Sequence, residues 1–212
     1  KGKMYSVFRL FNRHNAHWLL QPKTTIAASI AALQKFGVFA NVNINKAEHC
    51  AFYALVGQQA EQLLKQHFQQ IPDSMSPVVQ CGNTTLLYIA GKSYQENHRY
   101  ILIDEALALE ALIAQFSLPI FTQPVWDLHE IISGFPLMNA TAIGEYVPQM
   151  LNVQAINGIS FTKGCYLGQE TVARMQYLGR NKRALFILTG KINAEVATDD
   201  IIERQLGENW RR

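Results

Sequence analysis

The sequence predicts an α+β fold, because segments with the two-residue period of a strand occur in pairs and alternate with single helical segments. The chain has 212 residues, of which 49% are hydrophobic and 17% charged, and this composition is typical of a folded protein with a packed core. A doubly wound parallel sheet would instead alternate single strands with helices. We therefore expect split βαβ units, in which paired strands and helices share one core.

The first part of the chain shows each signal in turn. Residues 4–11 and 16–21 alternate in hydrophobicity on either side of an Asn-rich turn, which predicts a hairpin. Residues 23–36 then place apolar side chains on one helical face, and Gly37 follows where the helix is expected to stop. Alternation returns in residues 38–44, which predicts the next strand.

The remaining elements follow the same rules of period and punctuation. Further strands are predicted at residues 51–56, 78–80, 84–89, 99–104 and 183–189. Further helices are predicted at residues 58–68, 105–116, 125–132 and 171–177. The strands at 78–80 and 84–89 are joined by Cys81-Gly82-Asn83, a short connection that predicts a second hairpin.

The positions of Pro and Gly residues, together with composition, divide the chain into three regions. Residues 1–118 form the α+β region, whose N-terminal part we expect to be missing because the chain starts without Met in a strand pattern. Residues 119–182 are interrupted by Pro and Gly and mostly irregular, as is typical of segments that carry function or wrap a ligand. Residues 183–212 indicate the opening of a further small domain that is cut short.

The stretch with the densest chemistry is Lys-Gly-Cys-Tyr-Leu-Gly-Gln-Glu at residues 163–170. Gly164 and Gly168 permit positive φ or the close approach of another group, so they favour a tight loop that presents a thiol. The helix predicted after the loop would place Cys165 near a helix N-terminus and near the Lys163 amine. Such surroundings favour the thiolate.

Arg174, on the same predicted helix, is a further cation within reach of this thiol. For Cys165 and Trp126, the residue type alone allows both a functional and a structural interpretation. Cys165 can equally belong to a packed connection in which a small apolar thiol fills a gap. Trp126 lies in the irregular region, where its flat ring can stack on a heteroaromatic ligand or wedge into the core.

Several function classes lack their sequence signals. No G-x-S-x-G elbow or G-x-G-x-x-G fingerprint occurs, and His129-Glu130 lacks the second His of a helical zinc site. The three cysteines lie far apart without a C-x-x-C pair, which argues against a local zinc or iron–sulfur site. A net charge of +3 without a dense basic stripe is weak evidence for nucleic acid.

No apolar run approaches the ~20 residues of a membrane span. The first residues also lack the apolar core of a signal peptide, so we expect a cytoplasmic location and no membrane partner. We further expect a monomer.

Residues 163–170 resemble the K-G-C-Y-x-G-Q-E signature of the YgfZ family of folate-binding proteins, relatives of the glycine-cleavage T-protein, and all seven specified positions match. The likeness includes residues 1–4, 9–11, 134–136, 147–149, 152–154, 158–161, 172–174 and 181–185. The resemblance therefore covers nearly the whole chain.

The resemblance implies a T-protein-like architecture, with ferredoxin-like α+β units around a central folate hole and a C-terminal β-barrel that starts at residues 183–212. It implies tetrahydrofolate or a one-carbon derivative as the cofactor, with Trp126 at its site. The other residues expected to bind it are Tyr166, Gln169, Glu170 and Arg174. Cys165 and Lys163 match the signature residues on which family activity is expected to depend.

The resemblance also implies partners. The family is tied to tRNA modification and to the maintenance of iron–sulfur enzymes, such as those that methylthiolate tRNA. In bacteria it is also tied to the control of replication initiation. We therefore expect folate and, indirectly, iron–sulfur enzymes that act on tRNA as partners, while direct tRNA contact stays open.

Two departures from the related patterns bear on the reaction. Tyr5-Ser6 stand where T-protein carries paired Asp residues, so the acid/base group expected for aminomethyl transfer is missing. Ile132 stands where the family usually has Glu. The first hypothesis is an accessory protein whose Cys165 thiolate reacts reversibly or transfers a group near bound folate. The alternatives are a folate-dependent one-carbon transferase with an unknown acceptor and a purely structural binding module.

Overall fold

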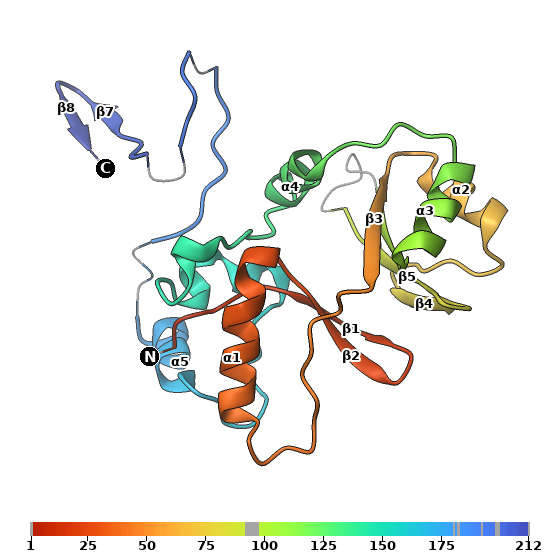
Figure 1. Ribbon diagram of the computed structural model, residues 1–212. Helices are drawn as coiled ribbons and strands as arrows, with labels where there is room; N and C mark the ends of the chain where they lie inside the picture. The colour runs from red at the N-terminus through yellow and green to blue at the C-terminus, as the bar shows by residue number, and fades with distance from the viewer. Residues whose placement is uncertain are drawn as a thin grey trace.

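The computed structural model contains a hairpin, a four-stranded sheet with two helices on one face, and an irregular helical region (Figure 1). It describes residues 2–91, 98–179, 181, 183–191, 193–197 and 200–211. Lys1 and Lys182, which belong to the segments of the resemblance, lie outside the described residues. The mixed α and β composition confirms the predicted class.

The first hairpin is confirmed, although its first strand begins later than predicted. Strands β1 (Arg9–Arg13) and β2 (Ala16–Leu20) pair antiparallel, with Arg9 opposite Leu20. Met4 pairs elsewhere: its N–H donates to the Tyr146 carbonyl at 2.9 Å, and its carbonyl accepts from Gly144 N–H at 2.8 Å. The segment before β1 is thus used to join the N-terminal hairpin to the irregular region.

Helix α1 (Ile26–Phe36) follows the short 3-10 helix η1 (Lys23–Thr25). The N–H of Gly37 donates to the Leu33 carbonyl at 2.7 Å, which ends the helix where the sequence predicted. Its predicted apolar face is only partly covered, because Leu33 and Phe36 are 42% and 59% exposed.

The four-stranded sheet has the order β3-β6-β5-β4 and antiparallel pairs throughout. Its strands are β3 (Cys50–Val56), β4 (Val78–Cys81), β5 (Thr84–Ile89) and β6 (Arg99–Glu105). The alternating directions make β3 and β4, which are joined through helix α2 (Ala60–His67), run antiparallel. A split βαβ unit joins parallel strands, so the prediction of such units is wrong for this sheet.

The two faces of the sheet carry different cores, because successive side chains of a strand point to opposite faces. On one face, Leu86, Tyr100 and Leu102 pack with α2 and with helix α3 (Ala106–Gln115). The buried residues of the other face are Phe11, Leu87, Ile101 and Ile103, with Trp18 and Trp126 packed against them. The second face therefore brings the hairpin and helix α4 (Gln123–Ile132) onto the sheet.

The region after α4 is built from short turns of helix. These are η2 (Ala140–Ala142), η3 (Pro148–Leu151), η4 (Val153–Ile156) and helix α5 (Gln169–Tyr177). A small third core of Val7, Met138, Leu151 and Val153 holds the three 3-10 helices together. The helices predicted around residues 125–132 and 171–177 are both confirmed, each starting two residues earlier.

Two predicted strands do not form. Residues 38–44 and 183–189 have no strand structure, and almost all of their side chains are exposed. A strand needs a second backbone to pair with, and the alternation of side chains identifies a face but supplies no partner. The last elements, β7 (Arg204–Leu206) and β8 (Asn209–Arg211), pair with each other and lie apart from the rest of the ribbon (Figure 1).

Candidate functional site

The loop of residues 163–168 presents Cys165 to solvent. Cys165 is exposed, and among the described residues no hydrogen bond reaches its thiol. The Lys163 N–H donates to Ser160 Oγ at 3.2 Å, and the Tyr166 hydroxyl donates to the Ser160 carbonyl at 3.5 Å. Both bonds fix the base of the loop and leave the thiol accessible.

The Lys163 amine lies over the ring of Tyr166. Its Nζ is 4.8 Å from the centroid of the Tyr166 ring, a cation–π distance. No hydrogen bond or ion pair among the described residues joins Cys165 to Lys163 or to Arg174. The support of a thiolate by these cations therefore stays a prediction.

Gly168 is the N-cap of α5, and its conformation requires glycine. Its φ is 86°, in the left-handed region, and a Cβ would lie 2.6 Å from the Gly2 nitrogen and closer still to the Gly2 Cα. Gly164 differs, because it has no positive φ and a Cβ there would meet nothing within 4 Å. The backbone therefore uses the freedom of glycine at Gly168, and it shows no such need at Gly164.

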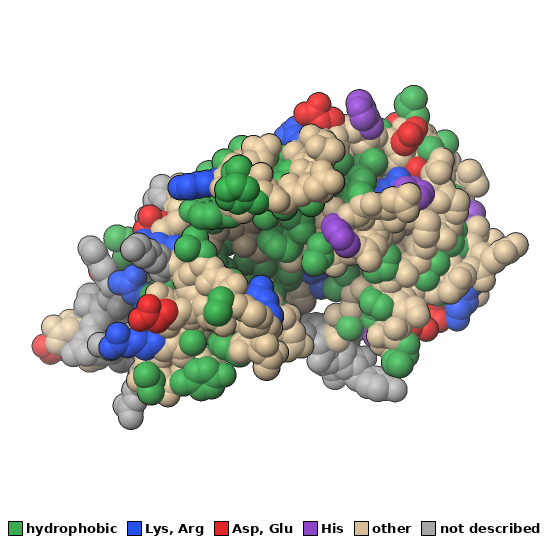
Figure 2. Space-filling view, turned by 90° about the horizontal axis from the view of Figure 1, so that it is seen from below, with side chains coloured by type: hydrophobic (Ala, Val, Ile, Leu, Met, Phe, Trp, Pro, Cys, Tyr) green, Lys and Arg blue, Asp and Glu red, His purple; other side chains and the backbone are tan. Residues whose placement is uncertain are grey.

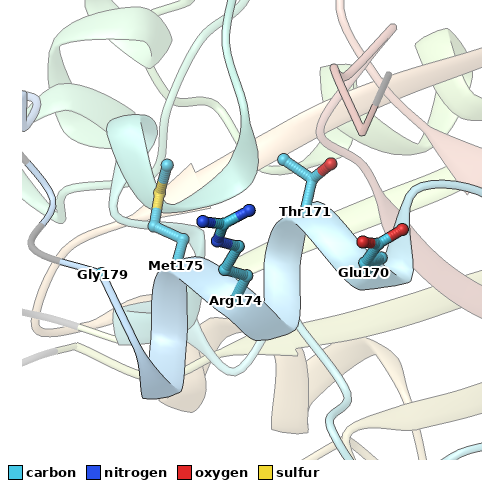
Figure 3. A pocket seen from close by; sticks show the side chains of 5 residues that line it. All are labelled: Glu170, Thr171, Arg174, Met175 and Gly179. Carbon is cyan, nitrogen blue, oxygen red and sulfur yellow. The ribbon is translucent and has the colours of Figure 1, made fainter.

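Helix α5 carries the other signature residues. The Gln169 N–H donates to the Tyr166 carbonyl at 3.1 Å, which joins the loop to the helix. Glu170 and Arg174 line an open depression of about 380 Å³ along one face of α5 (Figure 3). Thr171, Met175 and Gly179 complete its lining.

Arg174 forms no ion pair with any described residue, so its charge is available to an anionic group.

Gln149 holds α5 against the short helices. It is 3% exposed, and its side-chain Nε2 donates to the Val172 carbonyl at 2.7 Å. Its backbone carbonyl accepts a hydrogen bond from Asn181 Nδ2 at 2.7 Å. Its Oε1 is buried without a partner among the described residues. In the sequence, Gln149 was noted only as part of residues 147–149, one of the segments of the resemblance.

Trp126 lies on α4, on the second face of the sheet. Its indole is half-buried against the Phe11, Leu87, Ile101 and Ile103 core, and Arg99 Cζ is 5.2 Å from the ring centroid. Among the described residues, no hydrogen bond, ion pair or ring contact joins Trp126 to residues 163–170, and helices α4 and α5 lie apart in Figure 1.

Glu130 is the functional candidate that sequence reasoning missed. It is 1% exposed and accepts hydrogen bonds from Arg9 Nη1 at 2.6 Å, Arg9 Nη2 at 3.0 Å and Arg99 Nη1 at 2.6 Å. Arg9 Cζ also lies 3.9 Å from the Phe135 ring centroid. We call these three charged residues, Arg9, Arg99 and Glu130, the arginine–glutamate cluster.

A sequence signal for the arginine–glutamate cluster did exist on α4. Glu130 lies four residues after Trp126, and therefore on the same helical face as an aromatic ring that packs on the sheet. A carboxylate on a buried face needs a cationic partner. The spacing in the sequence did not show which arginines would supply it.

Ser6 is one of the two residues that the resemblance places at the paired Asp of T-protein. Its hydroxyl lies 3.1 Å from Thr25 Oγ1 and 3.3 Å from the Val7 carbonyl oxygen, so it serves local hydrogen bonding. Ile132, at the place of the family Glu, is 49% exposed. Neither position carries a carboxylate.

The three thiols differ in their surroundings. Burial raises the pKa of the Cys81 thiol, whose Sγ donates to the Gln70 carbonyl at 3.4 Å. Cys50 is half-buried at the start of β3, and Cys165 is the exposed one. No group of three or more His, Cys, Asp or Glu among the described residues is placed to hold a metal ion.

No helix of the part that the structure describes is both long and apolar enough to cross a membrane.

Comparison with known proteins gives a class and then a family. Residues 181–212 match the family described as "YgfZ, beta-barrel domain". The whole chain is 58% identical over 212 residues to the "tRNA-modifying protein YgfZ" of Colwellia psychrerythraea. It is 37% identical over 218 aligned residues to proteins of the same name from Yersinia enterocolitica and Yersinia pestis. The chain belongs to the YgfZ family.

The chain spans 64% of the length of each of these relatives, while all of this chain is covered.

Proposed function

We propose that this protein is a folate-binding accessory protein that supports iron–sulfur enzymes and thereby the methylthiolation of tRNA. The observation that carries the tRNA part is the 58% identity to a relative named as a tRNA-modifying protein, which extends over the whole of this chain. Folate, the iron–sulfur clients and a link to replication control are further parts of the proposal.

The chain offers groups that fit a folate. A pterin is a flat heteroaromatic ring, and it needs a flat partner with one face free. Trp126 is half-buried, and Arg99 lies near its ring. Residues 121–132 also carry exposed apolar side chains, namely Phe121, Val125, Leu128, Ile131 and Ile132. Figure 2 shows a hollow in the face seen from below, with hydrophobic side chains on its walls.

These features support a T-protein-like arrangement of the full-length protein, with tetrahydrofolate or a one-carbon derivative in a central hole. When bound, tetrahydrofolate supplies a reduced carrier of one-carbon units. Trp126 would stack on the flat ring, and Arg174 would attract an anionic group at the edge of α5. Cys165 would act as the nucleophile, because its thiol is exposed ahead of α5.

The one-carbon transferase is the weaker alternative. Ser6 at the T-protein Asp position makes hydrogen bonds within its own segment and with η1, and it offers no carboxylate for proton transfer. No contact of the described residues favours a transferase over the accessory role.

The tRNA part can be tested in cells that lack their own copy of the gene. We expect the full-length protein to restore methylthiolated nucleosides in tRNA, measured by mass spectrometry, and Cys165→Ala to lose this effect. Cys81→Ala is the matched control, because it removes a thiol that is half-buried elsewhere. Full restoration by Cys165→Ala would contradict the reactive thiol.

The folate part can be tested by calorimetric titration of tetrahydrofolate into the full-length protein. Aromatic stacking on a base is worth ~1–3 kcal/mol, so we expect Trp126→Ala to weaken binding roughly 5- to 150-fold. Trp126→Phe keeps a ring and should lose less. Equal affinity of wild type and Trp126→Ala would remove Trp126 from the site.

A further inference from the structure

We propose that Arg99 is a positioning residue for Trp126, and that it sets the orientation of the indole ring through its bonds to Glu130 and Ser133. The effect on ligand binding rests on the proposed folate function. The effect on the indole ring itself does not depend on any ligand. The inference follows from the arginine–glutamate cluster, which the sequence and the proposed function leave without a role.

The guanidinium of Arg99 is held by two different acceptors. Its Nη1 donates to Glu130 Oε1 at 2.6 Å, and its Nη2 donates to Ser133 Oγ at 2.9 Å. Ser133 Oγ in turn donates to the Glu130 carbonyl at 3.0 Å. Because a guanidinium is planar, two bonds through separate nitrogens fix the direction of its plane.

This fixed plane lies next to the Trp126 ring. Arg99 Cζ is 5.2 Å from the ring centroid, within the range of a cation–π interaction, and the Arg99 side chain is only 5% exposed. A buried cation beside an indole favours ring orientations that turn the ring face toward the charge. Trp126 and Glu130 are also four residues apart on α4, so the ring and the anchor of Arg99 share one helical face.

Arg9 provides the matched control within the same cluster. It also donates two hydrogen bonds to Glu130, but its Cζ lies over Phe135 at 3.9 Å, and it has no ring contact with Trp126. Arg9→Lys and Arg99→Lys therefore both keep the charge and both weaken the bonding of Glu130. Only Arg99→Lys removes the planar group beside the indole.

The spectroscopic test uses near-ultraviolet circular dichroism of the full-length protein without ligand. The contribution of Trp126 is the difference between the wild-type spectrum and that of Trp126→Phe. We expect Arg99→Lys to reduce this contribution by more than half, and Arg9→Lys to leave it nearly unchanged, with equal far-ultraviolet spectra. An unchanged Trp126 contribution in Arg99→Lys would overturn the proposal.

The binding test is a double-mutant cycle with tetrahydrofolate, because a residue that acts through another loses its effect when that other residue is removed. We expect Arg99→Lys to raise the Kd several-fold in the wild-type background and less than twofold in the Trp126→Ala background. An equal increase in both backgrounds would show that Arg99 acts independently of Trp126 and would overturn the proposal.

The two tests separate this inference from the proposed function. If the wild type binds no tetrahydrofolate, the proposed function fails, and the spectroscopic result alone decides the role of Arg99. If the wild type binds but Arg99→Lys leaves both the spectrum and the Kd unchanged, the positioning role fails while folate binding stands.

Discussion

The surroundings of Glu130 and those of Cys165 represent opposite ways of treating a reactive side chain. Glu130 is 1% exposed and accepts three hydrogen bonds from two arginines. Cys165 is exposed and accepts or donates none among the described residues. At the first site two arginines compensate the buried charge of the carboxylate, whereas at the second the thiol stays open to the approach of an outside group.

The difference teaches where rigidity is placed in this fold. The arginine–glutamate cluster connects β1, β6 and α4, which are far apart in the sequence. The loop with Cys165 is held at its base by Ser160 and at its end by Gly168 against Gly2. A ring that stacks on a ligand gains from a rigid support, and a nucleophile gains from access.

The largest effect on stability is expected for the substitution Glu130→Ala. The substitution leaves two guanidinium groups without their carboxylate, and breaking a buried pair in this way costs ~3–5 kcal/mol of the free energy of unfolding. The measurement is urea denaturation of the full-length protein. Glu110→Ala on the exposed surface of α3 is the control, and it should change stability by less than ~0.5 kcal/mol. A loss below ~1 kcal/mol for Glu130→Ala would contradict the buried pairing of this carboxylate with the two arginines.

A medium effect is expected at the end of the loop. Gly168→Ala forces a side chain into a backbone with φ of 86° and against Gly2, so we expect a loss of ~1–3 kcal/mol in stability. Gly164→Ala has open space and no positive φ, and it should stay within ~0.5 kcal/mol. Thermal unfolding of the two variants side by side measures the difference. Equal stability of the two would mean that Gly2 does not pack on α5 in solution.

The smallest effect on the fold, and the sharpest on reactivity, concerns the thiols. We expect iodoacetamide to alkylate Cys165 several-fold faster than Cys81 at about pH 7, because Cys165 is exposed and burial raises the pKa of Cys81. Because a raised pKa leaves less thiolate at a given pH, the alkylation rate of Cys81 should continue to rise above about pH 9. Peptide mass spectrometry follows each thiol separately. Equal rates at about pH 7 would contradict the contrast between the two sites.

The elements that the sequence predicted well are those with a complete local signal. Helix α1 has its apolar period and its stop at Gly37, and the hairpin of β4 and β5 has its Gly-Asn turn. Residues 38–44 carried an equally regular alternation and formed no strand, since a strand also requires a partner that no local pattern can name. The same reason applies to residues 183–189.

The candidate site also has features that the sequence could predict and features that it could not. The signature residues of 163–170 could be found from the sequence because they are contiguous, and the exposed position of Cys165 fits the prediction of a presented thiol. The placing of the Lys163 amine on Tyr166 could not be found, because it depends on side-chain torsions that a signature does not encode.

By itself the sequence determined the family, the α+β class and the loop that carries the thiol, because each of these depends on residue order and local period. Only the tertiary structure decided that Arg9, 121 residues before Glu130, shares that carboxylate with Arg99, and that Trp126 lies beside Arg99. The physical reason is that a buried carboxylate must find cations in space, and folding can bring them from any distance along the chain.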